Sequence, residues 1–372
     1  MKILPVLFLA AGLFLPLTHL RADPPAPSPP PVVDAAALPV GVPFSDPALA
    51  YSGRFKKGGQ DGPACQWPAS AVALHFEGTD LNVRLTDNNG QSRWQVVLDG
   101  RPGGVLALHK GAGTYRVASG LPPGAHMVRL VKATESFFGV TRVNGFELNA
   151  GGHPLPAEGL PHRIEVVGDS ISCGYGVQAA GKDEHLLPAN ENAWLAYGAV
   201  AARLLGADYT CLAWSGRKLW PDKTIVELYD RTLPLEPMDN WDFKSAPAPQ
   251  VVVVTLGTND LGKVLPDEAG WIAAYKAFIE RLRRNYPGVT VYCATSPMLS
   301  NGGEVKKRTV LHDWLTKIVD ESTVAGDKNI HLLDFPPQNP KNGLGADYHP
   351  SAKTQELMGQ QLADTIRKDL GW

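Results

Sequence analysis

Five segments of the sequence place polar residues suited to acyl-transfer chemistry close behind an apolar run. They are Gly168-Asp169-Ser170, Ser215-Gly216, Gly257-Thr258-Asn259-Asp260, Ser296-Pro297 and Asp347-Tyr348-His349. If each apolar run is a strand of one parallel sheet, these residues meet at its carboxyl edge, where α/β folds bind ligands. A hydroxyl, an imidazole and a set of N–H donors gathered at such an edge are the components of a serine hydrolase.

Ser170 is the candidate nucleophile and His349 the candidate general base. Ser170 follows the first expected strand and His349 follows the last, so both belong to the same edge. The carboxylate of Asp347 is expected to orient the imidazole from two residues away. A backbone carbonyl could hold the imidazole instead, which would leave a Ser-His pair, and Asp169 and Asp334 are further candidates for the acid.

The same edge offers three donors for the negatively charged oxygen of an acyl-transfer intermediate. They are the backbone N–H of Ser170, the backbone N–H of Gly216 and the side-chain amide of Asn259. Trp220 and Trp241 lie in an irregular stretch between expected elements, where aromatic rings can line a cleft and stack on sugar rings. Trp194 and Trp214 are assigned to core packing.

Composition excludes several classes of protein. The chain has 372 residues, 44% of them hydrophobic, and a formal net charge of -2, which fits two domains and gives no basic patch for nucleic acid. The ten histidines show no metal-ligand spacing, so no metal site is expected. The four cysteines, Cys65, Cys173, Cys211 and Cys293, are expected to be buried free thiols.

The chain starts with features of an export signal. Met1-Lys2 is followed by an apolar segment to residue 17, and Ala22 offers a small residue for cleavage. We therefore expect a signal peptide over 1–22, a proline-rich linker over 23–40, a secreted or periplasmic protein, no membrane span after cleavage, and a monomer. An uncleaved N-terminal anchor is the alternative interpretation.

Two regions with different sequence patterns follow the linker. Residues 41–152 contain short runs of strand-forming residues separated by turn sequences, which predicts an antiparallel β-sandwich. From 153 to 372 strand and helix patterns alternate, which predicts a three-layer α/β domain. Its strands are expected at 162–167, 207–214, 250–256, 289–294 and 329–335, and its helices at 192–205, 223–231, 267–285, 304–323 and 351–370.

The four blocks Gly168-Asp169-Ser170-Ile171, Gly216, Gly257-Thr258-Asn259-Asp260 and Asp347-Tyr348-His349-Pro350 resemble those of the SGNH (GDSL-type) hydrolases. The N-terminal half, with segments such as Tyr51-Ser52-Gly53-Arg54, Trp67-Pro68-Ala69-Ser70 and Lys132-Ala133-Thr134-Glu135, is similar to the jelly-roll domain of carbohydrate esterase family 2.

The resemblance implies a jelly-roll sandwich joined to an SGNH domain with a five-stranded parallel sheet. It also implies deacetylation of polysaccharides such as xylan or glucomannan without a cofactor, with the nucleophile at Ser170, the base at His349 and oxyanion donors at Ser170, Gly216 and Asn259. Asp347 departs from the wider SGNH pattern, in which Asp stands three residues before His. The alternatives are a broad-specificity acylhydrolase or lipase, and a glycan-binding protein without turnover.

Overall fold

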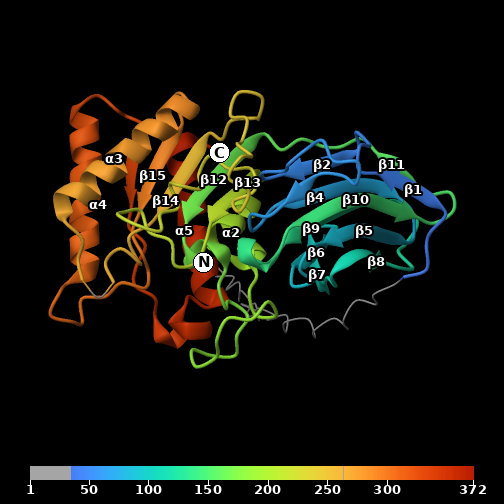
Figure 1. Ribbon diagram of the computed structural model, residues 1–372, viewed down its shortest axis with the longest axis horizontal. Coiled ribbons are helices and arrows are strands. Elements are labelled where there is room, and N and C mark those ends of the chain that lie inside the picture. The colour runs from blue at the N-terminus through green and yellow to red at the C-terminus, as the bar shows by residue number, and fades with distance from the viewer. Residues whose placement is uncertain (1–34, 263) are drawn as a thin grey trace, which may run out of the picture.

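The computed structural model describes residues 35–262 and 264–372. A β-rich N-terminal part and an α/β C-terminal part lie side by side along the long axis of the molecule (Figure 1). The expected signal peptide over 1–22, and the linker as far as residue 34, lie outside the described residues. Among the described residues no helix is both long and apolar enough to cross a membrane.

The N-terminal part is built from two antiparallel sheets. One has the order β1-β10-β5-β8, with β3 paired to β10; the other has the order β11-β4-β9-β6-β7, with β2 paired to β4. The strands are β1 (Val40–Pro43), β2 (Leu49–Ser52), β3 (Ala64–Cys65), β4 (Ala71–Glu77), β5 (Leu81–Asp87), β6 (Arg93–Leu98), β7 (Arg101–Ala107), β8 (Gly111–Ala118), β9 (Ala125–Lys132), β10 (Thr141–Leu148) and β11 (His153–Leu155).

Inward-facing residues of both sheets, such as Val83 of β5 and Leu74 of β4, belong to one buried cluster. The alternation of apolar and polar residues along these strands directs one side of each sheet into that core. The predicted antiparallel sandwich is confirmed.

The C-terminal part is organised around a five-stranded parallel sheet, as predicted. Its strands are β12 (His162–Gly168), β13 (Ala207–Ala213), β14 (Val251–Thr255), β15 (Thr290–Ala294) and β16 (Ile330–Leu333), in the order β13-β12-β14-β15-β16. From β12 the chain moves to β13 on one side and then crosses to β14 on the other side of β12. The topological switch point therefore lies between β12 and β14. In doubly wound folds the crevice outside the carboxyl ends of such strands is the ligand site.

Helices cover both faces of this sheet. Helices α2 (Tyr197–Leu204) and α5 (Ala352–Leu370) pack with Val251 and Val253 of β14, whereas α3 (Glu268–Asn285) and α4 (Lys307–Val324) pack with Val252 and Val254. Because successive strand residues point to opposite faces, a continuous valine run is what a strand buried on both sides requires. The short helix α1 (Ser170–Cys173) and the 3-10 turns η1 (Ser136–Phe138), η2 (Ala193–Leu195), η3 (Pro340–Asn342) and η4 (Ala346–Tyr348) lie in the loops.

Two predicted helices differ from the structure. The helix expected over 223–231 is wrong, because this segment consists of turns anchored from outside: Arg54 donates to the carbonyls of Tyr229 and Arg231. Helices this short have little stability of their own, so tertiary contacts decide the backbone. The helix expected over 192–205 is divided into η2 and α2 by extended backbone at Ala196.

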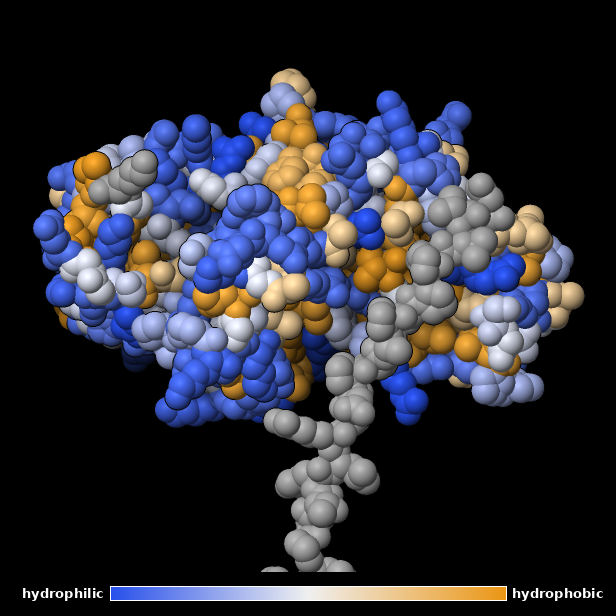
Figure 2. All heavy atoms as spheres, turned by 90° about the horizontal axis from the view of Figure 1, so that it is seen from below, coloured by the Kyte–Doolittle hydropathy of each residue, from blue (hydrophilic) through white to orange (hydrophobic). Residues whose placement is uncertain are grey.

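The two parts share one buried apolar cluster and several polar contacts. Ala71 and Val131 of the sandwich belong to the same buried cluster as Ile164 of β12. The backbone N–H of Ala193 donates to the carbonyl of Ala133 at 2.8 Å. Seen from below, the surface is mainly polar, with apolar patches between the two parts (Figure 2). The sandwich is therefore packed against the α/β part as a fixed neighbour.

Candidate active site

Ser170 and His349 lie within hydrogen-bond reach although 179 residues separate them, since Ser170 Oγ is 2.8 Å from His349 Nε2. Ser170 is the first residue of α1, directly beyond β12, and is 6% exposed. The side chain of Asp169 caps the helix by accepting from the Ile171 N–H at 3.0 Å. This cap fixes the strand-to-helix turn that presents the serine hydroxyl.

The final helix holds the histidine loop against the serine turn. Gln355 of α5 donates to the carbonyl of Ile171 at 2.8 Å and accepts from the backbone N–H of Tyr197 at 2.8 Å. On the other side Gly176, with φ +54, allows the two loops to meet, because a Cβ there would lie 2.3 Å from the Cβ of Ala346. These contacts fix the relative position of the two reactive side chains.

The imidazole of His349 is oriented by a backbone carbonyl. Its Nδ1 lies 3.0 Å from the Ala346 oxygen, so the hydrogen-bond pattern assigns the proton to Nδ1 and leaves Nε2 to accept from Ser170. Burial lowers the pKa of His349, an effect only partly opposed by the nearby carbonyls and by the charge of Asp347. The residue is therefore neutral near pH 7, as a general base must be.

The expectation that Asp347 contacts the imidazole is wrong. Its two carboxylate oxygens accept from Tyr175 Oη at 2.7 Å and from His185 Nδ1 at 2.7 Å. Asp347 has a left-handed backbone, φ +49, in a tight turn, and its side chain is held by these two partners. Tyr175 stacks on the ring of His349 with centroids 4.0 Å apart, so Asp347 acts on the imidazole through this ring.

The other candidate acids have different partners. Asp334 accepts from Arg308 and Thr295, and Asp169 caps α1. Burial raises the pKa of Asp169 to about 7.

The three expected oxyanion donors lie on the loops after β12, β13 and β14. Gly216 is exposed and has φ +77, with open space where a Cβ would stand. The backbone N–H of Ser170, in the first turn of α1, has no acceptor within the helix. The amide nitrogen of Asn259 donates to the Arg217 carbonyl at 2.9 Å and faces Asp169 Oδ2 at 3.3 Å. One amide hydrogen is therefore firmly bound, and the other has a long contact that it can exchange.

Sequence reasoning missed the residue that holds the Gly216 loop. Asp260 Oδ1 accepts from the backbone N–H groups of Leu219 and Trp220, both at 3.0 Å, and from Trp271 Nε1 at 2.8 Å. One buried carboxylate thereby fixes the loop after β13 to the loop after β14. The block Gly257-Thr258-Asn259-Asp260 was recognised for its amide, but it also carries this anchor.

The two tryptophans proposed for sugar stacking lie in different places, and only Trp241 is far from the reactive groups. Trp220 packs on α3, where a Cβ at Gly270 would lie 2.9 Å from its ring. Trp241 lines a cavity of about 680 Å³ near Arg163 and Asp208, at the opposite edge of the sheet from Ser170.

Trp214 packs against the core of the α/β part, as expected, and it directly precedes the Gly216 loop. Trp214 is only partly buried, and its ring lies 6.2 Å from that of Phe137, which is 40% exposed. The guanidinium of Arg217 lies over the Trp214 ring, 5.0 Å from the centroid. Phe137 comes from the sandwich, so no pattern within the α/β part could have indicated it.

Comparison with known proteins gives two family matches. Residues 51–157 match the model described as carbohydrate esterase 2 N-terminal, and residues 166–357 match the GDSL-like lipase/acylhydrolase family. CelE, a cellulase/esterase of Acetivibrio thermocellus, is 35% identical over 88% of this chain, which spans 40% of the length of CelE. An acetylxylan esterase/glucomannan deacetylase of Cellvibrio japonicus is 26% identical, with 88% of this chain and 90% of the relative covered.

The solved structures agree with the sequence matches. A family two carbohydrate esterase from Clostridium thermocellum, in complex with cellohexaose, superposes with a TM-score of 0.82 at 35% identity, covering 87% of this chain and 99% of that one. The chain therefore belongs to carbohydrate esterase family 2.

Proposed function

We propose that the chain is a carbohydrate O-acetyl esterase that works through an acetyl-serine intermediate on Ser170. The observation that carries this proposal is the 2.8 Å contact between Ser170 Oγ and His349 Nε2 beside three loop donors. Its relatives include enzymes named acetylxylan esterase and glucomannan deacetylase, which supports an acetylated plant polysaccharide as substrate.

In the proposed reaction Ser170 Oγ attacks the acetyl carbonyl carbon while His349 Nε2 accepts its proton. The carbonyl oxygen becomes negatively charged and accepts from the N–H groups of Ser170 and Gly216 and from the Asn259 amide. Asn259 exchanges its long contact with Asp169 for this oxygen. His349 then protonates the departing sugar oxygen, which leaves an acetyl ester on Ser170.

A water molecule completes the cycle. His349 removes its proton, the water oxygen attacks the acetyl ester, and collapse of the second tetrahedral intermediate returns the proton to Ser170 Oγ and releases acetate. The carbonyl of Ala346 keeps the imidazole in the required tautomer throughout. Protein groups and water supply every proton in this scheme.

The test is acetate release from acetylated xylan, acetylated glucomannan and acetylated monosaccharides, with Ser170→Ala as the matched variant. The wild type is expected to release acetate and Ser170→Ala to release none, with an unchanged thermal unfolding midpoint. Activity retained in the variant refutes Ser170 as nucleophile. A wild type that prefers long-chain nitrophenyl esters over acetyl esters would favour a broad acylhydrolase or lipase instead.

Glycan binding without turnover is a second candidate function, since a relative at 35% identity is solved in complex with cellohexaose. Phe137, which is 40% exposed and lies against Trp214 just before the Gly216 loop, offers an aromatic surface for an unacetylated glucan. Calorimetric titration of Ser170→Ala with cellohexaose measures this binding. Inhibition of wild-type acetate release by the same oligosaccharide would place both functions on one surface.

We further propose that the protein is secreted and acts as a monomer. The apolar segment after Lys2 and the small residue Ala22 support export, and the proline-rich stretch supports a spacer between signal and sandwich. N-terminal sequencing of protein recovered from the culture medium or periplasm tests the cleavage after residue 22, and size-exclusion chromatography with light scattering tests the oligomeric state.

A further inference from the structure

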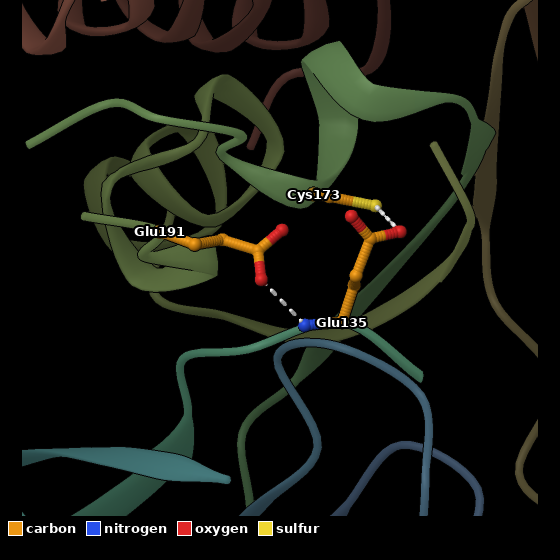
Figure 3. Close-up of side chains that lie close together, drawn as sticks. All are labelled: Glu135, Cys173 and Glu191. Carbon is orange, nitrogen blue, oxygen red and sulfur yellow. Dashed lines mark hydrogen bonds between the residues drawn. The ribbon is translucent and has the colours of Figure 1, made fainter. Parts of the chain in front are cut away.

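A buried carboxyl pair lies where the sandwich meets the α/β part. Glu135 follows β9 of the sandwich, and Glu191 lies in the loop before η2. Both residues are buried, and together with Cys173 they have polar atoms within 4.8 Å of one another (Figure 3). Two carboxyl groups out of water are costly unless each is neutralised or hydrogen-bonded.

The contacts assign different protonation states to the two carboxyls. Glu135 accepts from the Ser215 N–H at 2.8 Å and from Ser215 Oγ at 2.6 Å, a donor set that suits a carboxylate. Glu191 accepts from the Glu135 N–H at 2.9 Å, and its Oε1 has no partner among the described residues. Burial and the neighbouring Glu135 raise the pKa of Glu191, so it is the neutral member.

A buried lysine lies near this cluster and interacts electrostatically with both carboxyls, which opposes the binding of a metal cation there. Lys132 is fully buried, and its ammonium donates to the carbonyls of Thr134 at 2.7 Å and Glu135 at 3.2 Å. Burial lowers the pKa of Lys132, whereas the nearby Asp87, Glu191 and Glu135 act in the opposite direction. The cluster therefore calls for a role other than cation binding.

The partners of Glu135 identify that role. Ser215 stands directly before Gly216, one proposed oxyanion donor. Glu135 Oε2 also accepts from Cys173 Sγ at 3.7 Å, and Cys173 is the last residue of the helix that begins with Ser170 (Figure 3). A single side chain from the sandwich thus contacts both segments that carry the backbone oxyanion donors.

We infer that Glu135 is a positioning residue for the oxyanion hole, through which the sandwich domain sets the reactivity of the α/β domain. This inference rests on the proposed esterase function. Oxyanion stabilisation depends on donors already held at the place where charge develops. Gly216 is exposed, and a glycine gives its loop wide conformational freedom. The two hydrogen bonds from Ser215 to Glu135 therefore restrict the direction of the Gly216 N–H.

The test compares Glu135→Gln and Ser215→Ala, singly and together, with a matched control at Glu165. Glu165 is also a buried carboxyl between the two parts, 3.6 Å from Arg54, but it lies in the middle of β12 and lines the cavity near Arg163 and Asp208. Each variant is assayed for kcat and KM with 4-nitrophenyl acetate, and for the rate at which a 4-nitrophenyl phosphonate ester labels Ser170. The phosphonyl oxygen takes the place of the oxyanion, so labelling reports donor placement.

In Glu135→Gln we expect kcat to fall by about ten- to a hundredfold with KM nearly unchanged, and the labelling rate to fall in parallel. Ser215→Ala keeps the backbone N–H bond to Glu135, so its decrease in kcat is expected to be smaller. Ser215→Thr keeps a hydroxyl and should have nearly the kcat of the wild type. The double variant should be close to Glu135→Gln alone, because Ser215→Ala removes only the Oγ bond to a carboxylate that Glu135→Gln has already replaced. Glu165→Gln should lower the unfolding temperature and leave kcat unchanged.

Two outcomes separate the inference from the proposed function. A wild type with no activity on any acetyl ester refutes the esterase function. An active wild type with folded Glu135→Gln within twofold of its kcat refutes the coupling alone, as does an equal loss in Glu165→Gln. If Glu135→Gln does not fold, Ser215→Ala decides: full activity and unchanged labelling in that variant overturn the inference.

Discussion

Replacement of Asp347 by asparagine discriminates between a catalytic triad and a Ser-His pair. In this structure the Asp347 carboxylate accepts from Tyr175 and His185, while the Ala346 carbonyl holds the Nδ1 proton of His349. Where a carboxylate itself holds the catalytic imidazole, its replacement by an amide costs about 10⁴-fold in kcat, because the wrong tautomer is stabilised. That cost does not apply when the tautomer is fixed by a carbonyl.

The magnitude for Asp347→Asn follows from the contacts that change. The variant keeps an oxygen that can accept from Tyr175, so the stacked ring stays near His349. What disappears is the negative charge, which strengthens the two hydrogen bonds and raises the pKa of His349. Of the two weakened hydrogen bonds, only the one from Tyr175 can affect the imidazole, through the stacked ring, so we expect kcat to fall by about tenfold or less.

The assay is the pH dependence of kcat and kcat/KM for 4-nitrophenyl acetate, measured for wild type, Asp347→Asn and Tyr175→Phe. Tyr175→Phe keeps the stacked ring and removes its bond to the carboxylate, so it isolates that contact. We expect both variants to stay within about tenfold of wild type. The acid limb of Asp347→Asn should move to lower pH, because a charge that favoured the imidazolium has gone. A loss of 10³-fold or more in a folded Asp347→Asn would show that the carboxylate orients the imidazole directly, and would refute the assignment to Ala346.

Three further predictions concern the surrounding structure. In the pH profile of kcat/KM, the midpoint of the acid limb should lie below the ordinary histidine value of 6.5, because burial lowers the pKa of His349 and the base must be neutral. A midpoint above 6.5 would contradict this reasoning. Asp260→Ala should lower the free energy of unfolding in urea by about 3 kcal/mol or more, because three N–H donors lose their acceptor. Asp260→Asn can still accept from them with one oxygen and should lose less stability. Equal losses in the two variants would argue against this anchor. The thiols of Cys65, Cys211 and Cys293, whose pKa values burial raises to about 12, should react with Ellman's reagent only after unfolding, and rapid labelling of the native protein would contradict their burial.

The α/β part was predictable because its elements carry strong local patterns. The valine run of β14 indicates a strand buried on both faces. The apolar spacing of α5 indicates a helix buried on one face. All five predicted strands occur, with ends that differ by two residues or fewer. The parallel sheet then brings Ser170 and His349 to one edge by topology alone, which is why residues 179 positions apart could be paired from the sequence.

The sandwich shows where turn chemistry misleads. β10 contains Asn144-Gly145, a pair typical of tight turns, yet the chain continues as a strand through a register shift at this point, with Gly145 at φ +133. β7 includes Pro102, Gly103 and Gly104, and it forms because it is an edge strand, where a missing N–H is tolerated. Both strands are stabilised by their neighbours in the sheet and not by their own sequence.

The failures in the site have one physical origin, which is that local spacing does not report side-chain direction. Asp347 is two residues from His349, but the turn between them has left-handed backbone at Asp347 and Tyr348, and the carboxylate faces Tyr175 instead. Glu135 is the opposite case, since it lies 80 residues from Ser215 in another domain and makes two hydrogen bonds to it. A contact across a domain boundary leaves no periodicity in the sequence, because each partner satisfies the pattern of its own domain. If Glu135 positions the oxyanion loop as inferred, the isolated α/β domain would contain every residue of the reaction and still be a poor esterase.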